Sequence, residues 1–271
     1  MIVQTKRLIK LPESIVTGLI FALFVCFIIG KSSGAIYYYY TDSELRHLWT
    51  KFMKNSDKIH ISGNYPYLDC FKKSAKKYNL PLPLLLAIAR GESDFNPKAV
   101  SIANCYGIMQ IKWPITAKDL GIKRKEDLFN PCLNIDAGAR YLAWLIKKYN
   151  GDLYFAISAY NVGPARVTKN FVPKNGRQYA SYIYQHLQYI ITKKYQRLQK
   201  LLLLEFTYYR NALIVMNYLK EKLKDVRMDI FKSEKYTYDI YILYSSEKEL
   251  KRAIKSLQEK VGLKPLGKYT F

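Results

Sequence analysis

The chain has 271 residues, of which 49% are hydrophobic and 15% aromatic. This much apolar material supports a packed core and excludes an intrinsically disordered protein. The formal net charge of +23 favours polyanionic partners, such as nucleic acid, anionic lipid or a carboxylate-rich cell wall. A generally basic surface without a specific partner is the alternative interpretation.

The N-terminal segment has the pattern of an export signal. Lys6, Arg7 and Lys10 precede the uncharged apolar block Ile15–Gly30, and basic residues ahead of such a block leave the N-terminus in the cytoplasm. The block is long for a signal-peptide core and slightly short for a spanning helix. We expect residues 1–34 to be a signal anchor or signal peptide. Either would place the protein on the periplasmic side of the inner membrane, anchored or released after cleavage, where nucleic acid is not a partner.

A helical region follows the first polar stretch. Residues 35–62 are polar and rich in tyrosine, so we expect a spacer there. The run Leu84–Ala89 is apolar on every side, which is typical of a central buried helix. Apolar residues also recur at helical spacing through residues 134–149. We therefore predict an all-α domain over residues 63–195.

Residues 196–271 have a different pattern, which predicts a small α+β domain. A strand and helix at residues 201–224 have an internal repeat at an offset of 38 residues. A duplicated strand–helix unit predicts one split-βαβ sheet of order βαββαβ. Expected strands are residues 201–206, 226–231 and 236–244 with a last one in LGKYTF, and expected helices are residues 210–224 and 247–261.

The cysteines outside the apolar block are Cys70, Cys105 and Cys132. Neither they nor the scattered histidines have the spacing of zinc ligands, so we expect no metal and no cofactor. In an oxidising compartment we expect Cys105 to pair with Cys132 and to leave Cys70 over. Three buried thiols are the alternative.

Four clusters of polar residues stand out in the helical region. They are GESDFNPKAVS (91–101), YGIMQI (106–111), NIDAGARYL (134–142) and AYNVGPARV (159–167). Taken singly, each has a structural explanation, because Glu92 could pair with Arg90 or Arg140 and Gln110 or Asn161 could be satisfied core residues. Their order along the chain favours a function.

In this order the clusters resemble the lytic transglycosylase domain of glycoside hydrolase family 23. The patterns E-S-x-F-N-P-x-A-x-S, G-x-M-Q, N-I-x-x-G-x-x-Y-L and A-Y-N-x-G carry the resemblance, which covers residues 65–189. It implies a lysozyme-like α fold and cleavage of the MurNAc–GlcNAc bond of peptidoglycan, leaving 1,6-anhydro-MurNAc ends. It also implies that Glu92 is the catalytic acid and base.

The resemblance further implies a set of substrate-binding residues: Ser101, Met109, Gln110, Tyr160, Asn161 and Tyr179. The sequence departs from the family pattern just before the last of these. The segment reads NGRQY, with Asn175 where the family often has a glutamate. The resemblance therefore does not assign a substrate-positioning glutamate on that side.

A carboxylate after an apolar run has a chemical reason in this reaction. Glu92 follows PLPLLLAIAR (81–90), and burying an acid is costly unless it is neutralised or used. Glycosidases usually need two carboxylates, but one suffices where the substrate supplies the second function. We expect apolar surroundings to keep Glu92 protonated, so that it donates a proton and later accepts one.

Two other classes of function remain open from the sequence. A lysozyme-type muramidase on the same fold needs a second acid, with Asp94, Asp127 and Asp136 as candidates. A non-catalytic glycan-binding protein would not need the intact set of Glu92, Gln110 and Tyr160. The C-terminal part more faintly resembles the sporulation-related repeat (SPOR) family, which implies glycan binding there. A protein partner in the cell envelope is the alternative.

Overall fold

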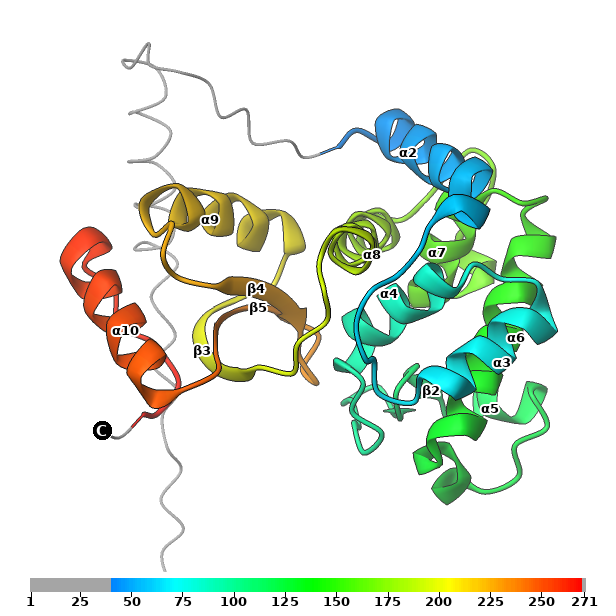
Figure 1. Cartoon of the computed structure of the whole chain (residues 1–271). Coiled ribbons are helices and arrows are strands. Elements are labelled where there is room, and N and C mark those ends of the chain that lie inside the picture. The colour runs from blue at the N-terminus through cyan, green and yellow to red at the C-terminus, as the bar shows by residue number, and fades with distance from the viewer. Residues whose placement is uncertain (1–39, 270–271) are drawn as a thin grey trace, which may run out of the picture. The chain divides into compact units, whose positions relative to one another are not determined.

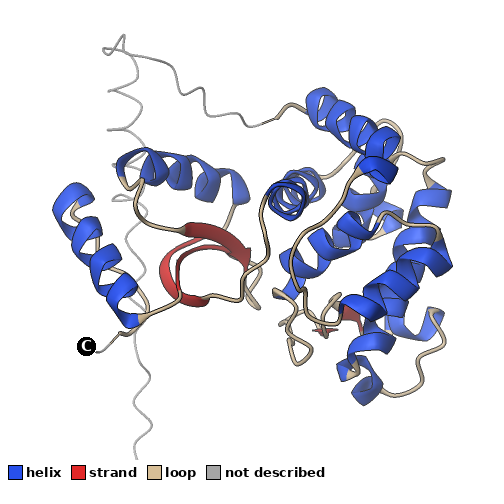
Figure 2. Cartoon of the chain, in the orientation of Figure 1, coloured by secondary structure: helices blue, strands red, loops and turns tan. Residues whose placement is uncertain are grey.

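The computed structural model describes residues 40–269, which form a helical part followed by a small α+β part (Figures 1 and 2). The helical part contains α2 (Asp42–Asn55), α3 (Leu68–Tyr78), α4 (Leu82–Ser93), α5 (Ile115–Asp119), α6 (Pro131–Lys148), α7 (Leu153–Val162) and α8 (Lys174–Thr192), with short strands β1 (Cys105–Tyr106) and β2 (Ile111–Lys112). The α+β part contains β3 (Gln199–Phe206), α9 (Tyr209–Lys222), β4 (Met228–Lys232), β5 (Tyr238–Tyr244) and α10 (Glu247–Val261). This architecture confirms the predicted fold class, mainly α with a small α+β addition.

The central helix α4 explains how an acid comes to lie among apolar residues. All residues from Leu84 to Ala89 are fully buried, and a helix that is apolar all round packs on every side. The helix ends where Asp94 adopts a left-handed φ of 51° and its amide donates to the Arg90 carbonyl at 3.0 Å. Glu92 therefore lies in the last turn of a helix that tertiary packing holds in place.

The loop of residues 106–111 is fixed by Asn134 near the start of α6. This side chain is fully buried, and its Oδ1 accepts from the Met109 amide at 2.7 Å. Its Nδ2 donates to two backbone carbonyls at 2.9 and 3.0 Å. One turn later, a Cβ at Gly138 would lie 2.6 Å from the Cβ of Met109, so only glycine permits this approach. The NIDAG motif thus serves to position the loop.

The expectation of a spacer over residues 35–62 is wrong for its described part. Residues 42–55 form α2, with Thr41 as N-cap and Glu44 completing a capping box. Leu45, Trp49 and Phe52 on one face are buried against the helical core. Their spacing is that of an amphipathic helix, which the many tyrosines and polar residues of the stretch obscured.

The α+β part has the predicted split arrangement. The strand order is β3–β5–β4 with antiparallel neighbours, so β3 and β4 run parallel on either side of β5. The helices α9 and α10 pack against the sheet, where Leu203 and Ile240 are fully buried. LGKYTF does not form the expected last strand within the described residues. Pro265 cannot donate to a ladder, although the amide of Gly267 still donates to the Leu202 carbonyl of β3 at 2.9 Å.

The predicted disulfide is also corrected. Cys132 pairs with Cys70, not with Cys105, and the Cα atoms of the pair lie 5.2 Å apart. The reason is helix packing: α3 lies against α6, and each helix carries one of the two cysteines near its start. The thiol of Cys105 instead lies 3.4 Å from the Tyr236 hydroxyl.

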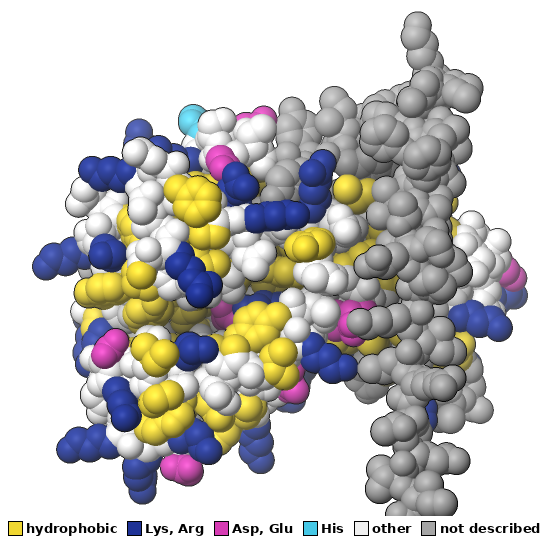
Figure 3. Space-filling model, turned by 180° about the vertical axis from the view of Figure 1, so that it is seen from behind, with side chains coloured by type: hydrophobic (Ala, Val, Ile, Leu, Met, Phe, Trp, Pro, Cys, Tyr) yellow, Lys and Arg dark blue, Asp and Glu magenta, His cyan; other side chains and the backbone are white. Residues whose placement is uncertain are grey.

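The surface carries the basic excess seen in the composition. On the face drawn in Figure 3, lysine and arginine side chains are spread widely, with few acidic side chains between them. Between residues 40 and 269, no helix is both long enough and apolar enough to cross a bilayer. The predicted signal segment, residues 1–34, lies outside the described residues.

One carboxyl of the sheet is buried with incomplete hydrogen bonding. Asp239 in β5 is 2% exposed, and its Oδ1 has no hydrogen-bond partner among the described residues. Its Oδ2 accepts from the Tyr241 hydroxyl at 3.3 Å. Burial raises the pKa of Asp239 from 3.8 to about 6, so ionising this group works against folding.

Replacing one cysteine of the disulfide should destabilise the protein more than replacing the free one. We expect Cys132→Ser to lower the free energy of unfolding by about 2–4 kcal/mol under non-reducing conditions, because the bond restricts the unfolded chain. Cys105→Ser is the control and should change it by less than about 1 kcal/mol. Urea unfolding with and without reductant measures both, and equal losses in the two variants would contradict the assigned pairing.

Asp239→Asn should stabilise the protein at neutral pH but not in acid. Because the pKa is raised in the folded state, the free energy of unfolding of wild type falls on the order of 1–3 kcal/mol as pH rises from about 4 to 6. The asparagine variant has no such loss, because its side chain does not ionise. Thermal unfolding at pH 3.5, 5 and 7.5 should show the gain growing with pH. Asp225→Asn is the control of opposite sign, since its hydrogen bond to Lys260 lowers the pKa of Asp225. A gain for Asp239→Asn that is independent of pH would refute the assignment.

Candidate active site

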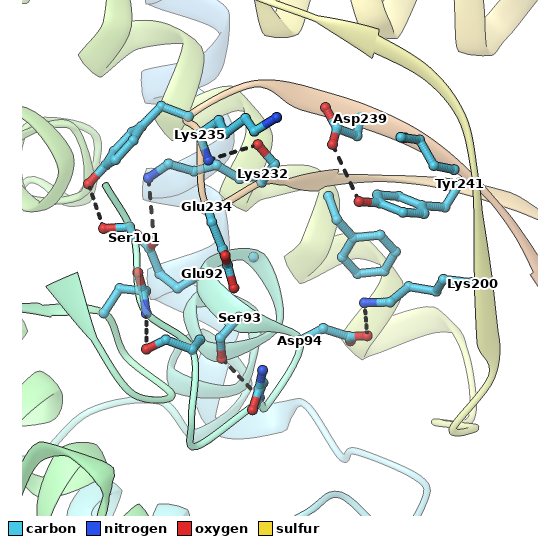
Figure 4. Close-up of a pocket in the computed structure, with 18 of the residues that line it drawn as sticks. Glu92, Ser93, Asp94, Ser101, Lys200, Lys232, Glu234, Lys235, Asp239 and Tyr241 are labelled. Atoms are coloured by element: carbon cyan, nitrogen blue, oxygen red, sulfur yellow. Dashed lines mark hydrogen bonds and ion pairs between the residues drawn. The ribbon is translucent and has the colours of Figure 1, made fainter. Parts of the chain in front are cut away.

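A pocket of about 400 Å³ separates the end of α4 from the sheet of the α+β part. Both of its walls belong to one compact unit of the chain. The helical part contributes Glu92, Asp94, Ser101 and Gln110, and the α+β part contributes Lys200, Phe231, Lys232, Lys235, Tyr236, Asp239 and Tyr241 (Figure 4). The pocket thus brings the predicted acid together with residues far along the chain.

Glu92 is held by a buried tyrosine. Its side chain is 5% exposed, and its Oε1 accepts a short hydrogen bond from the hydroxyl of Tyr179 in α8. Burial and then the nearby Glu92 charge raise the pKa of Tyr179 well above its ordinary value. The phenol therefore stays protonated at neutral pH and remains a donor that orients the Glu92 carboxyl.

A lysine from the α+β part reaches the same carboxyl. The Nζ of Lys232, at the end of β4, lies 3.4 Å from Oε2 of Glu92 and 3.2 Å from Oδ1 of Asn161. Its side chain is only 9% exposed. The expectation of purely apolar surroundings for Glu92 is therefore wrong, because one donor from each part of the protein contacts the carboxyl.

A buried ion pair joins the two walls beneath the pocket. Arg90, two residues before Glu92, donates to Asp229 of β4 at 2.7 Å and to Nδ1 of His186 at 2.5 Å. Its guanidinium also lies 3.7 Å from the ring centre of Tyr189. Burial, together with the Arg90 charge, lowers the pKa of His186 to about 3. Nδ1 of the neutral imidazole can therefore accept a hydrogen bond from the Arg90 guanidinium.

Ser101 connects the other rim of the pocket to the sheet. Its Oγ accepts from the Cys105 amide at 3.1 Å and lies 3.4 Å from the Tyr236 hydroxyl. Tyr236 has a left-handed φ of 65°, which breaks the strand alternation just before β5. Simple alternation would place Tyr236 on the same face as Tyr238. Because the backbone turns at Tyr236, the two side chains lie on different faces. Tyr238 instead packs on Tyr182 and Tyr209.

Gln110 lines the pocket in a constrained conformation. Its φ is 51°, and its Nε2 donates to the carbonyl of Gly107 at 2.9 Å and of Ala99 at 3.3 Å. A side chain so tied to its own loop presents its amide in one orientation. The structure thus brings Gln110 to the same pocket as Glu92 and Ser101.

Two of the predicted substrate-binding side chains lie behind the pocket wall. Met109 is fully buried against Gly138, so its side chain cannot touch a glycan. Tyr179 is also fully buried, and its hydroxyl donates to Glu92. Tyr160 is partly buried, and its hydroxyl donates to the Met109 carbonyl at 2.8 Å. The sequence motif did not distinguish residues that line the pocket from those that support it.

The candidate second acids are engaged elsewhere. Asp136 bonds to Lys77 at 2.8 Å and to the Tyr78 hydroxyl at 2.9 Å, and Asp127 pairs with Arg124. Both line a separate pocket next to α6. Asp94 does line the pocket of Glu92, but it pairs with Lys200 at 2.8 Å.

Sequence reasoning missed the contribution of the α+β part to this site. Lys232, Tyr236 and Asp239 all line the pocket, yet no motif includes them. Nothing in their spacing signals that a strand some 140 residues later contacts Glu92. An apolar strand that ends in lysine was the one local hint.

The comparisons with known proteins agree with the motifs. The family profile described as "Transglycosylase SLT domain" matches residues 69–183. The chain is 35% identical over 158 residues to the membrane-bound lytic murein transglycosylase C of Edwardsiella ictaluri, covering 48% of this chain and 44% of that protein. The protein of the same name from Actinobacillus pleuropneumoniae is 39% identical over 119 residues, covering 39% and 33%.

Solved structures of lytic transglycosylases are more distant. The lytic transglycosylase Slt of Pseudomonas aeruginosa has a TM-score of 0.37 at 19% identity, over 76% of this chain and 26% of that one. The 70-kDa soluble lytic transglycosylase of Escherichia coli has a TM-score of 0.41 at 21% identity, over 58% and 32%.

The chain spans less than half the length of the curated relatives that it matches. The matched segment contains Glu92 and the other predicted site residues, whereas Lys232, Tyr236 and Asp239 lie outside it. The resemblance drawn from the motifs is therefore confirmed for residues 69–183, which match the Transglycosylase SLT domain.

Proposed function

We propose that this protein is a lytic transglycosylase that cleaves the MurNAc–GlcNAc bond of peptidoglycan without water and leaves 1,6-anhydro-MurNAc ends. The observation that carries the proposal is Glu92, a buried acid at the end of α4 that opens onto a pocket and is oriented by Tyr179. The match of residues 69–183 to the Transglycosylase SLT domain supports the same activity.

One carboxyl performs both proton transfers in this proposal. Protonated Glu92 donates to the glycosidic oxygen as the bond to C1 of MurNAc breaks. The N-acetyl group of the same sugar stabilises the cationic C1, which supplies the function of a second carboxylate. Glu92, now a carboxylate, removes the proton from the C6 hydroxyl as that oxygen attacks C1. The ring closes, Glu92 is protonated again, and no cofactor is consumed.

Several residues are assigned to the glycan on this proposal. Ser101 and Gln110 line the pocket beside Glu92. Asn161 accepts a hydrogen bond at 3.2 Å from Lys232, the same lysine that contacts Glu92. Hydroxyl and amide groups of this kind bind the hydroxyl and N-acetyl groups of sugars. Tyr160 and Tyr179 are assigned a positioning role, because their hydroxyls bond to Met109 and Glu92.

A hydrolytic muramidase is the second candidate, and one observation keeps it in view. Asp94 lines the same pocket as Glu92 and is the only one of the sequence-predicted acids to do so within the described residues. Its ion pair with Lys200 argues against a role as the base that activates water. The substrate-assisted reaction needs no such base and is preferred.

We assign the protein to the cell envelope, with export through its N-terminal segment. The names of the relatives, membrane-bound lytic murein transglycosylases, support this location. The basic surface suits a wall polymer that carries carboxylates. Anchoring in the inner membrane, glycan binding by the SPOR-like α+β part inside the pocket of Glu92 and a protein partner in the envelope are further parts of the proposal.

Glu92→Gln should abolish cleavage while it leaves folding and binding to sacculi intact. Glutamine keeps the size and the hydrogen bond from Tyr179 but cannot deliver a proton, so we expect a rate at least 10²-fold lower. Turbidity loss of purified sacculi measures the rate. Asp94→Asn, which neutralises the neighbouring acid of the same pocket, is the control and should keep most of the activity. Residual cleavage by Glu92→Gln within about tenfold of wild type would remove Glu92 from the mechanism.

The reaction products distinguish the two enzymatic candidates. Attack by the C6 hydroxyl gives fragments that are lighter by one water than the products of hydrolysis. Mass spectrometry of soluble muropeptides should find 1,6-anhydro ends as the main species. Fragments with mainly reducing ends would instead establish the muramidase.

A further inference from the structure

The ammonium of Lys232 lies where the proposed function places the glycan strand. It lies between Glu92 and Asn161, 3.4 and 3.2 Å from their oxygens. Both residues are assigned to the substrate in the proposed function. A strand that contacts Glu92 and Asn161 directly must therefore displace this ammonium.

The same contact opposes the chemistry that Glu92 has to perform. Tyr179 donates to Oε1 of Glu92 and the Lys232 ammonium contacts Oε2, so neither oxygen is free to approach a glycosidic oxygen. The positive charge that develops at C1 would also be repelled by an ammonium held beside the catalytic acid. The contact with Glu92 is thus suited to the resting protein and not to the reacting complex.

Displacement of Lys232 requires only a side-chain movement. Its backbone amide donates to the Tyr182 hydroxyl at 2.9 Å, and the turn after it is closed by a 2.8 Å bond from the Ser233 amide to the Thr237 carbonyl. The end of β4 is therefore fixed, while the flexible four-carbon stem of the lysine can rotate within the pocket.

A displaced Lys232 needs a new anionic partner. The side chain is 9% exposed in the ion pair, and a strand that fills the pocket removes the remaining water. Leaving one charge of a buried pair without its partner is strongly unfavourable. The nearby acids Asp94 and Asp229 are already paired with Lys200 and Arg90. Of the other acids that line the pocket, Glu205 and Glu234 are exposed to solvent, and burial raises the pKa of Asp239 to about 6. A carboxylate of the substrate is the partner that enters the pocket together with the strand.

We propose that Lys232 is a specificity-determining residue that selects glycan strands bearing carboxylates. On binding, a carboxylate of the strand, carried by its lactyl or peptide substituents, replaces Glu92 as the partner of the ammonium. Glu92 is thereby released to act as the acid. A neutral strand offers no such exchange and meets the closed ion pair. This inference rests on the proposed function and adds the substrate class to it.

The test compares native sacculi with sacculi whose carboxyl groups have been converted to amides. The rate of muropeptide release is measured per molecule of bound full-length protein, so that weaker general attraction to the neutral wall does not enter. Wild type should cleave native sacculi at least about tenfold faster than amidated ones, because only the native strand stabilises the displaced charge.

Lys232→Met removes the charge and keeps the length of the side chain. It should cleave native and amidated sacculi at rates within about twofold of each other, and it should cleave amidated sacculi faster than wild type does. Lys232→Arg keeps the charge and should keep the preference. Lys235→Met is the matched control, since it removes a lysine that lines the same pocket from an exposed position, and it should retain the preference.

Several outcomes would overturn the inference. Equal rates of wild type on the two substrates would exclude carboxylate selection, and this comparison needs no variant to fold. A preference that Lys232→Met retains would assign the selection to another residue. A loss of activity by Lys232→Met that is equal on both substrates would make Lys232 a residue that positions Glu92. Failure of the proposed function is distinct, because wild type would then cleave neither substrate.

Discussion

The pocket depends on the buried ion pair between Arg90 and Asp229. Arg90 is 3% exposed and lies on α4 two residues before Glu92, and Asp229 lies on β4 three residues before Lys232. Their 2.7 Å contact fixes the distance between the helix that carries the acid and the strand that carries the lysine. Losing Asp229 would cost about 3–5 kcal/mol, because the Arg90 charge would stay buried without its partner, whereas the Asp229 side chain is 26% exposed. Neutral His186 and the ring of Tyr189 complete the guanidinium contacts.

Much of the helical part follows from local sequence signals. The run Leu84–Ala89 is apolar at every position, and a helix of that composition has to be central. Asn134 and Gly138 belong to a motif whose order along the chain pointed to the site, and both fix the loop of residues 106–111. The sheet was equally predictable, because a repeated strand–helix unit has few ways to pair its strands. Each of these features could be predicted because its signal lies in residues close together in the sequence or in an internal repeat.

The features that sequence did not reveal are contacts between distant segments. Cys70 pairs with Cys132 because α3 lies against α6, and no spacing of three cysteines encodes that packing. Met109 belongs to the same motif as Gln110, yet adjacent residues of a tight loop point in different directions, so one is core and one lines the pocket. Lys232 is the extreme case, since its contact with Glu92 joins residues 140 positions apart.

The α+β part is therefore better understood as one side of the pocket than as a separate module that binds the cell wall. Its sheet presents two faces by strand alternation, and one is covered by α9 and α10. The other bears Asp229, Phe231 and Tyr241, which face α4 and the pocket. Because this face lines the pocket, it is not free to bind a second glycan strand outside the pocket. In the proposed function, any glycan that reaches its aromatic side chains does so inside the pocket, next to Glu92. Recognition by the sheet and cleavage by the acid would then act on the same strand.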